Sequence, residues 1–468
     1  MLHVDYDLWR ETITQRLAEG ARFAGGWAVG SGPSAAWRVA LLVTGRPAEV
    51  LSCSAREDRV PSIVDLVSAA EWDEREAHDL YAIKFDGHEP MRALIAHPRG
   101  PTAWMTPVSG FGVHEVAVGP IQPGVIESGH FRFHVAGERI LALDKRLFFK
   151  HRGLERAAEG GDYACGLAHA GRACAACTVA NSVAYAHAVE YALGLWPDRD
   201  LQIARTMLLE LERLYNHLHD IGTFCASAGY APGAMAFFTL KDRAQNINER
   251  LAGHRFLFHA VAIGVGALVI DRARADTARG ELRDLRADAA AAWREFELAG
   301  SIQARLNTIG VLNHHAALRL GTSGPAARAA GVPTDIRSHS PRLWYGTDFR
   351  AAIPREATGD VAARLQIRAA ELETSCDLLD ELLAHPLPRG GSTPAHQPVA
   401  VGLGLVESPR GTTLAAVEIS AERIERLRLR TGSYANWPAL AYAAIGNLLP
   451  DFPLIRKSFE LCYACVDR

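Results

Sequence analysis

The stretch that decides the fold is Arg172-Ala173-Cys174-Ala175-Ala176-Cys177, a Cys-x-x-Cys pair near the start of the second third of this 468-residue chain. A second pair, Cys462 and Cys465, ends three residues before the last residue. Most of the chain lies between the two pairs. If they form one site, the main domain has to fold so that they meet.

Thiolate sulfur is a soft ligand. Four thiolates together select zinc, iron–sulfur clusters, copper(I) or nickel over hard cations. Two Cys-x-x-Cys pairs most often hold a structural zinc ion, but zinc ribbons place their pairs only a few tens of residues apart. The spacing therefore indicates a metal site assembled from distant parts of the fold, with structural zinc as the alternative to a redox-active metal.

The composition favours a large cytoplasmic protein with a packed core. Hydrophobic residues make up 49% of the chain, which is long enough for two or more domains. The net charge of −3 gives no reason to expect nucleic acid as a partner. We expect neither a membrane-spanning helix nor a cleavable secretory signal, because no long apolar run occurs. Cytoplasmic thiols stay reduced, so the eight cysteines are expected to be metal ligands or buried side chains.

Turn-rich sequence divides the chain near residue 100. His97–Thr102 is rich in Pro and Gly and predicts a linker. Before it, short strands at Leu41–Val43 and Val50–Cys53 and a helix over Ser62–Tyr81 predict a small α+β domain. The predicted division is a domain at 1–100, a linker at 101–111 and a second domain at 112–468.

The second domain is predicted to begin with a β hairpin and to continue mainly as α-helix. His130–Val135 alternates polar and apolar side chains, and a turn leads from it into Ile140–Leu143. From about residue 150, apolar residues recur every three or four positions, as in Leu211–Ile221 and Leu282–Phe296, which predicts long helices in a bundle. Strands or loops return at 385–411. The predicted fold class is α+β.

Five stretches follow one another in a fixed order from residue 151 to the end. They are His151–Glu155, Arg172–Cys177, Glu407–Gly411, Tyr434–Pro438 and Glu460–Arg468. The first contains Arg-Gly-x-Glu, the third Pro-Arg-Gly, and two contain the cysteine pairs. In content and order they resemble the motifs of nickel–iron hydrogenase large subunits.

The N-terminal part indicates which subgroup of these large subunits the chain resembles. Trp72–Leu80, followed by Ile83, Phe85 and Gly87, is similar to the 30-kilodalton subunit of respiratory complex I. Gly324-Pro325, Gly331–Asp335 and Arg337 are similar to a stretch that the 49-kilodalton subunit shares with membrane-bound hydrogenases. A fusion of these two parts resembles the large subunit of the group 4 membrane-bound hydrogenases, the formate hydrogenlyase type.

The resemblance implies a nickel–iron centre held by the four cysteines. Cys174 and Cys462 would be terminal thiolates on nickel, and Cys177 and Cys465 would bridge nickel to an iron that carries carbon monoxide and cyanide. Hydrogen would be split heterolytically there.

Three further residues have roles implied by the resemblance. Glu155 would receive a proton from a terminal cysteine sulfur. Arg410 would lie over the open coordination position and orient what binds there. Ser433 would donate a hydrogen bond to a cyanide ligand. Outside the motifs, we would interpret these residues as a charge at a helix start, a surface arginine and an exposed turn serine.

The resemblance also implies partners and a location. No further cysteine cluster in this chain is spaced for iron–sulfur ligation, so electrons would leave through a separate small subunit that carries [4Fe–4S] clusters. Membrane subunits akin to a proton pump would complete the complex. The chain would be a peripheral subunit on the cytoplasmic face of the cell membrane, with H2 and protons as substrates.

The chain departs from the family pattern beside its ligands. Ala175 stands where the first motif usually has glycine, Asn181 where it usually has histidine, and Leu461 where the second usually has proline. Because such neighbours orient ligands and tune a metal, the changes bear on hydrogen turnover more than on ligation. Two alternatives stay open: a complex I-like quinone-module subunit without hydrogenase activity, and a protein with structural zinc. The quinone alternative expects histidine where Ser128 stands.

Overall fold

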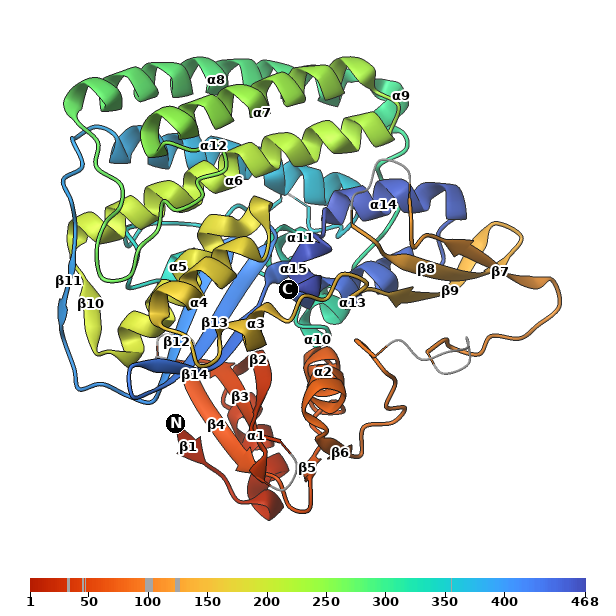
Figure 1. Cartoon of the computed structure of the whole chain (residues 1–468). Coiled ribbons are helices and arrows are strands. Elements are labelled where there is room, and N and C mark those ends of the chain that lie inside the picture. The colour runs from red at the N-terminus through yellow and green to blue at the C-terminus, as the bar shows by residue number, and fades with distance from the viewer. Residues whose placement is uncertain (32–33, 44–45, 47, 97–103, 123–126, 355) are drawn as a thin grey trace.

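The N-terminal part of the chain is a sheet with a helix against it (Figure 1). In the computed structural model, which describes residues 1–468 except 32–33, 44–45, 47, 97–103, 123–126 and 355, its strand order is β1-β4-β3-β2. Trp9, Ile13, Trp37 and Leu51 are fully buried in its core. The predicted strand Val50–Cys53 is confirmed as part of β4, and of the predicted Leu41–Val43 the first two residues are the end of β3. The elements are β1 (Leu2–His3), η1 (Tyr6–Leu8), α1 (Trp9–Ala18), β2 (Arg22–Val29), β3 (Ala36–Leu42), β4 (Glu49–Ser54), β5 (Arg59–Pro61), η3 (Ser68–Ala70), α2 (Glu71–Tyr81) and β6 (Lys84–Asp86).

The helix predicted over Ser62–Tyr81 is wrong in its first half, because α2 begins only at Glu71. The carboxylate of Glu74 accepts hydrogen bonds from the Ser62 hydroxyl (2.7 Å) and the Ile63 amide (2.9 Å). These bonds fold the preceding segment back against α2 and so replace helical hydrogen bonds. The linker predicted at His97–Thr102 lies outside the described residues, and the division at 101–111 stays a prediction.

The predicted hairpin is confirmed, and a third strand that was not predicted extends it into a three-stranded sheet. β8 (His130–Ala136) pairs with β9 (Arg139–Arg146), and β7 (Val113–Val118) pairs with the other edge of β8. Phe131 and Phe133 point inward and contact the ring of Phe452. β7 keeps several side chains exposed, and so it lacks the apolar pattern that would have revealed it.

Long helices form the upper half of the molecule in Figure 1, as predicted for most of 150–300. The central helix is α6, whose N-cap Asp198 accepts a hydrogen bond from the Leu201 amide. No helix among the described residues is both long and apolar enough to cross a membrane. The elements are α3 (Leu154–Ala158), α4 (Tyr163–Arg172), η4 (Ala175–Cys177), α5 (Thr178–Ala192), β10 (Leu195–Pro197), α6 (Arg199–Ser227), α7 (Ala231–Ala252), α8 (Arg272–Leu298), α9 (Gly300–Gln303), α10 (His314–Arg319), α11 (Gly324–Ala329), η5 (Ile336–His339), α12 (Val361–Leu382), α13 (Gly432–Ala444), η6 (Leu449–Asp451), α14 (Phe452–Phe459) and α15 (Ala464–Asp467).

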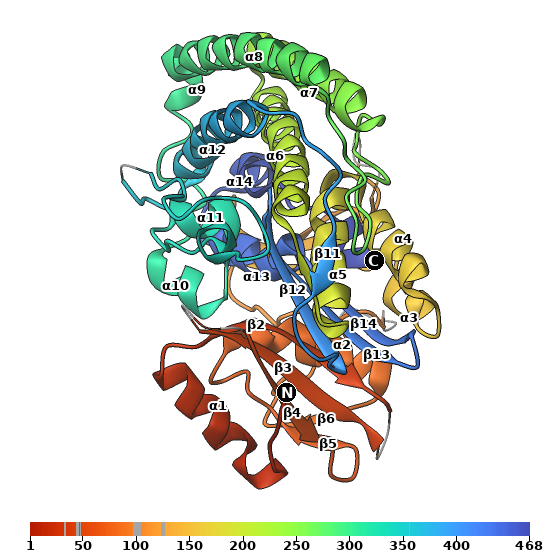
Figure 2. The same ribbon diagram turned by 90° about the vertical axis from the view of Figure 1, so that its left-hand side faces the viewer.

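A second sheet, of β12 (Val401–Ser408), β13 (Gly411–Ser420) and β14 (Arg423–Arg430), lies between the helices and the N-terminal sheet (Figure 2). The short strand β11 (Ser392–Pro394) pairs with β10 instead. Strands were predicted only up to residue 411. β14 was missed because its alternating arginines suggest a solvated surface, whereas Arg428 and Arg430 are buried against Asp73 of α2.

Two glycines of β12 let the backbone of α5 lie directly on the sheet. A Cβ atom on Gly404 would lie 1.9 Å from the carbonyl oxygen of Ala184, and one on Gly402 would lie 1.9 Å from that of Ala188. Neither contact can relax by moving a side chain. The second and third turns of α5, the helix that follows Cys177 directly, are therefore positioned by a backbone contact.

We expect Gly404→Ala to lower the free energy of unfolding by about 3 kcal/mol, because overpacking against a fixed backbone forces the helix away from the sheet. Urea denaturation measures this change. Gly280→Ala on α8 is the matched control, since no atom of the described residues outside its own helix lies within 4 Å of its added Cβ and alanine favours a helix. Equal stability of the two variants would contradict the packing argument.

Candidate metal centre

The structure brings both cysteine pairs together in the interior. The Sγ atoms of Cys174 and Cys462 are 3.2 Å apart, and those of Cys174, Cys462 and Cys465 all lie within 4.8 Å of one another. The thiol of Cys177 contacts those of Cys174 and Cys465. Cys465 has no exposed surface, and Cys177 is 2% exposed.

Arg152 forms hydrogen bonds with both cysteine segments and so links them. Its guanidinium donates hydrogen bonds to the carbonyl of Ala173 (2.8 Å), next to the first pair, and to that of Ala464 (3.4 Å), inside the second. Arg152 belongs to the Arg-Gly-x-Glu stretch. One function of that stretch is therefore to hold the chain segments in place.

One face of α6 supports the first cysteine pair, and sequence reasoning missed it. Asn216 donates to the carbonyl of Ala176 (2.7 Å), and the Tyr215 hydroxyl donates to that of Ala175 (3.4 Å). The carboxylate of Glu212 accepts from the amides of the first turn of α5. Positions 212, 216 and 220 are four residues apart and so share one helix face. This spacing of polar residues is the pattern from which the face could have been predicted.

Burial raises the pKa of Glu212 to about 8, because two backbone hydrogen bonds and nearby arginines compensate only part of the lost hydration. At neutral pH this carboxyl therefore holds a proton, next to Cys177.

Arg410 lies beside the thiols and is buried. It is 5% exposed, and its charge interacts with Cys177 and Cys462. Three groups orient the guanidinium: it donates to Asp220 Oδ1 (2.7 Å), Asn216 Oδ1 (2.9 Å) and the carbonyl of Glu460 (3.1 Å).

Glu155 is buried and tightly paired. Arg468 donates to its Oε1 at 2.6 Å, the Leu429 amide donates to the same oxygen, and Arg426 lies 3.3 Å from its Oε2. Burial opposes ionisation, but the charges of Arg468, Arg428 and Arg426 outweigh it and lower the pKa of Glu155. The carboxylate is therefore a weaker base than an ordinary glutamate.

Ser433 is buried at the N-terminal end of α13, and its Oγ accepts a hydrogen bond from the amide of Cys462 (3.0 Å). Because that bond uses an oxygen lone pair, the hydroxyl proton remains available to a group at the thiols. Asn181 lies one helical turn after Cys177 and is fully buried. Among the described residues its amide oxygen and nitrogen have no hydrogen-bond partner.

These residues fit a metal centre. Hydrogen bonds from the thiols of Cys174 and Cys465, followed by the charge of Arg410, lower the pKa of Cys177 to about 6, so this thiol loses its proton more readily than an ordinary cysteine. Contacts with the other thiols raise the pKa of Cys465 well above its usual value. Several thiolates can share this buried space only with cations between them, and metal binding displaces the protons. The unpaired amide of Asn181 leaves hydrogen-bonding capacity beside the cluster.

Comparisons with known proteins bear directly on this site. Residues 39–108 match the family described as respiratory-chain NADH dehydrogenase, 30 Kd subunit, and residues 228–401 match the 49 Kd subunit. Formate hydrogenlyase subunit 5 of Escherichia coli is 31% identical over 454 residues, covering 88% of this chain and 78% of that protein. The chain belongs to this family of fused 30 kDa- and 49 kDa-like subunits.

Other proteins similar to this chain have different names. The C/D component of the NADH-quinone oxidoreductase of Phocaeicola vulgatus is 26% identical over 404 residues, covering 77% of this chain and 75% of that protein. A protein in the structure of the archaeal membrane-bound sulfane sulfur reductase shares the fold, with a TM-score of 0.69 and 24% identity over 76% of this chain and 99% of that one. This chain is an oxidoreductase subunit of the hydrogenase and complex I family, with a cysteine cluster suited to a metal.

Proposed function

We propose that this chain is the catalytic subunit of a membrane-associated nickel–iron hydrogenase of the formate hydrogenlyase type. The observation that supports it best is the convergence of four thiols beside a buried arginine, Arg410. The cysteines Cys174, Cys177, Cys462 and Cys465 would hold a centre of nickel and an iron that carries carbon monoxide and cyanide. A centre of this kind supplies heterolytic cleavage or formation of H2.

The protein groups around the centre would position it and handle protons. Arg410, held by Asp220 and Asn216, would orient small molecules over the open side of the thiols. Ser433 would donate to a cyanide ligand. Glu155 would take up the proton released at a cysteine sulfur, and Glu212 is a second candidate because its pKa lies closer to neutrality.

Partners and location belong to the same proposal. Electrons would pass to a small subunit with [4Fe–4S] clusters, and membrane subunits would hold the complex at the cytoplasmic face of the cell membrane. Relatives of this chain are named as parts of membrane-bound complexes, which supports this arrangement.

The second candidate is a quinone-reducing subunit of the complex I type without hydrogenase activity. The similarity to a component of an NADH-quinone oxidoreductase favours it. Ser128, where that function expects histidine, and the full set of four cysteines favour the hydrogenase.

Metal analysis and infrared spectroscopy of the purified complex distinguish these functions. We expect nickel and iron bound to this subunit, together with stretching bands of iron-bound carbon monoxide and cyanide. Zinc without nickel would overturn the hydrogenase proposal in favour of a structural site. No bound metal, combined with quinone reduction by the complex, would favour the second candidate.

A further inference from the structure

A cavity of about 230 Å³ lies between the N-terminal part of the chain and the main domain. One wall comes from α1, β2, β3 and the segment before α2, and its apolar side chains include Phe23, Leu42 and Leu66. The opposite wall comes mainly from α10 and from the segment between α11 and η5, with Leu318 and Val332. Figure 2 shows α10 above β2 on the side of the molecule where these parts meet. The cavity is therefore mainly apolar and is shared by two parts of the chain.

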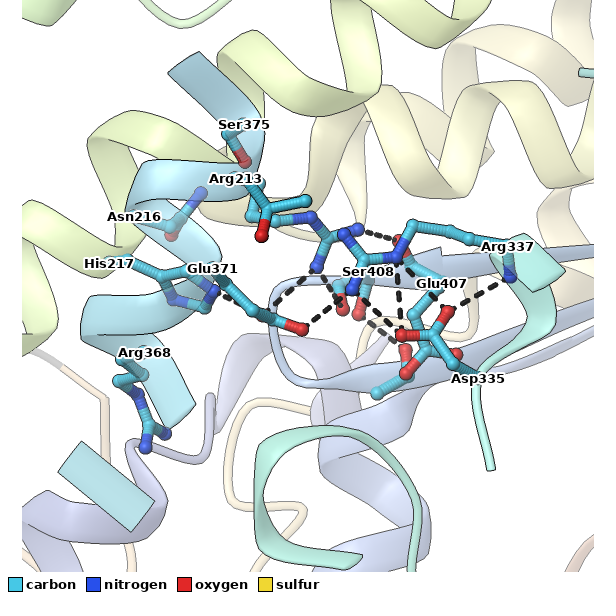
Figure 3. Close-up of polar contacts among 12 residues, drawn as sticks. Arg213, Asn216, His217, Asp335, Arg337, Arg368, Glu371, Ser375, Glu407 and Ser408 are labelled. Atoms are coloured by element: carbon cyan, nitrogen blue, oxygen red, sulfur yellow. Dashed lines mark hydrogen bonds and ion pairs between the residues drawn. The ribbon is translucent and has the colours of Figure 1, made fainter. Parts of the chain in front are cut away.

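The carboxylate that lines this cavity, that of Asp335, is already neutralised. Figure 3 shows it facing Arg337, whose Nη2 donates to Oδ2 (2.7 Å) and whose amide donates to Oδ1 (2.9 Å). The guanidinium of Arg328 lies 3.0 Å from the same carboxylate. Two guanidiniums thus hold Asp335 from behind the wall. Its charge is not available to a group inside the cavity.

Hydroxyl groups on the same wall have unused hydrogen-bonding capacity. Thr322 is 5% exposed, and among the described residues its Oγ1 has no hydrogen-bond partner. Next to it, Ser323 Oγ accepts from the amide of Thr412 (3.1 Å), which leaves its hydroxyl proton free to be donated. A buried hydroxyl without a partner destabilises a fold, so the Thr322 hydroxyl indicates that a molecule in the cavity pairs with it.

The charged residues that line the cavity are three arginines and one aspartate, so its surroundings are positive. Arg430 is paired with Asp73 (3.0 Å), and its guanidinium carbon lies 5.4 Å from the centre of the Phe23 ring. Arg22 begins β2 and has exposed surface, and it forms no hydrogen bond or ion pair among the described residues. The carboxylate of Glu407 attracts its charge without pairing with it. All the donors of Arg22 are therefore available to an anion.

The size of the cavity limits the size of its ligand. An apolar cavity of about 150 Å³ is enough to bind benzene. The 230 Å³ found here therefore has room for one such ring together with a carboxylate. Arginine suits a carboxylate in particular, because its planar guanidinium can donate parallel hydrogen bonds to both oxygens. An anion without an apolar body would leave the apolar walls unfilled.

We propose that this cavity binds a small carboxylate with a flat apolar body, about the size of benzoate. Arg22 supplies the opposite charge, and the Thr322 hydroxyl supplies a hydrogen bond. Phe23 and Leu66 pack against the apolar body. None of the four cysteines lines the cavity, so this site is separate from the metal centre and does not rest on the proposed function. Because the two walls belong to different parts of the chain, the bound ligand stabilises their association.

The first test is equilibrium dialysis of benzoate against the purified full chain. We expect saturable binding of one molecule per chain at roughly millimolar concentration, since so small a ligand forms few contacts. Benzylamine keeps the ring and reverses the charge, whereas inorganic phosphate keeps the negative charge without the ring. Each should bind roughly tenfold more weakly or not at all. No saturable binding of benzoate, or equal binding of either comparison compound, would overturn the proposal.

The second test repeats the dialysis with variants of the two polar groups. Arg22→Gln should weaken the binding of benzoate by roughly tenfold, because it removes a charged donor. Thr322→Val keeps the shape of the side chain and should weaken binding by several-fold. It should not lower the melting temperature of the free protein, because the hydroxyl has no protein partner to lose. Unchanged affinity in both variants would show that benzoate binds elsewhere and would contradict the assignment.

Thermal melts with and without saturating benzoate separate ligand binding from an effect on folding. Benzoate should raise the melting temperature of the unmodified chain, because it binds the folded state. Arg294→Gln, at an exposed position of α8, is the matched control and should show the same rise. At the same benzoate concentration Arg22→Gln should show a much smaller rise. An equal rise in Arg22→Gln and Arg294→Gln would overturn the role of Arg22.

Discussion

Cys465→Ala should abolish hydrogen-dependent dye reduction and release most of the bound nickel. The Cys465 thiol contacts the other three cysteines of the cluster, so its removal takes away the group shared by all of them. The loss should exceed the roughly 10- to 100-fold that changes to neighbours of a ligand cost. Nickel content and dye reduction, measured on the same preparation, check this result.

Cys376→Ala is the matched control. Cys376 is also buried, but it lies on α12 and forms no part of the thiol cluster. We expect this variant to keep its nickel and its turnover. If Cys465→Ala behaves in the same way, the ligand assignment fails.

Glu155→Gln should cut turnover by roughly 10²-fold while nickel stays bound, because an amide cannot take up and release the proton. The substitution also removes a charge that faces Arg468, Arg428 and Arg426. Breaking a buried ion pair costs about 3–5 kcal/mol, so a thermal melt has to show that the variant is folded at the assay temperature. Turnover per bound nickel is the quantity to compare.

Glu212→Gln identifies which carboxyl moves the proton. Its side chain already holds a proton at neutral pH, so the amide replaces a neutral group and disturbs the charge balance little. If Glu155 is the relay, Glu212→Gln keeps most of the turnover. Full activity of Glu155→Gln, with loss of activity in Glu212→Gln, would move the relay to Glu212.

Several elements of the fold could be predicted because their local patterns are strong. The hairpin at β8 and β9 alternates polar and apolar residues, and α6 repeats apolar residues at helical spacing. The segment before Glu71 and strand β14 could not be predicted. The first is held as a loop by Glu74, and the arginines of the second are buried by carboxylates from α2, so a distant partner decides each structure.

The chain by itself determined which residues are chemically suited to the site. The two cysteine pairs, Arg410 and Glu155 are recognisable because soft thiolates and motif order are properties of sequence. Only the tertiary structure decided their environment. It surrounds Glu155 with arginines, places Glu212 and Asn216 under the first pair, and holds Arg410 against Asp220. Dehydration and the charges of distant residues set how strongly each group holds a proton, and both arise only when the chain is packed.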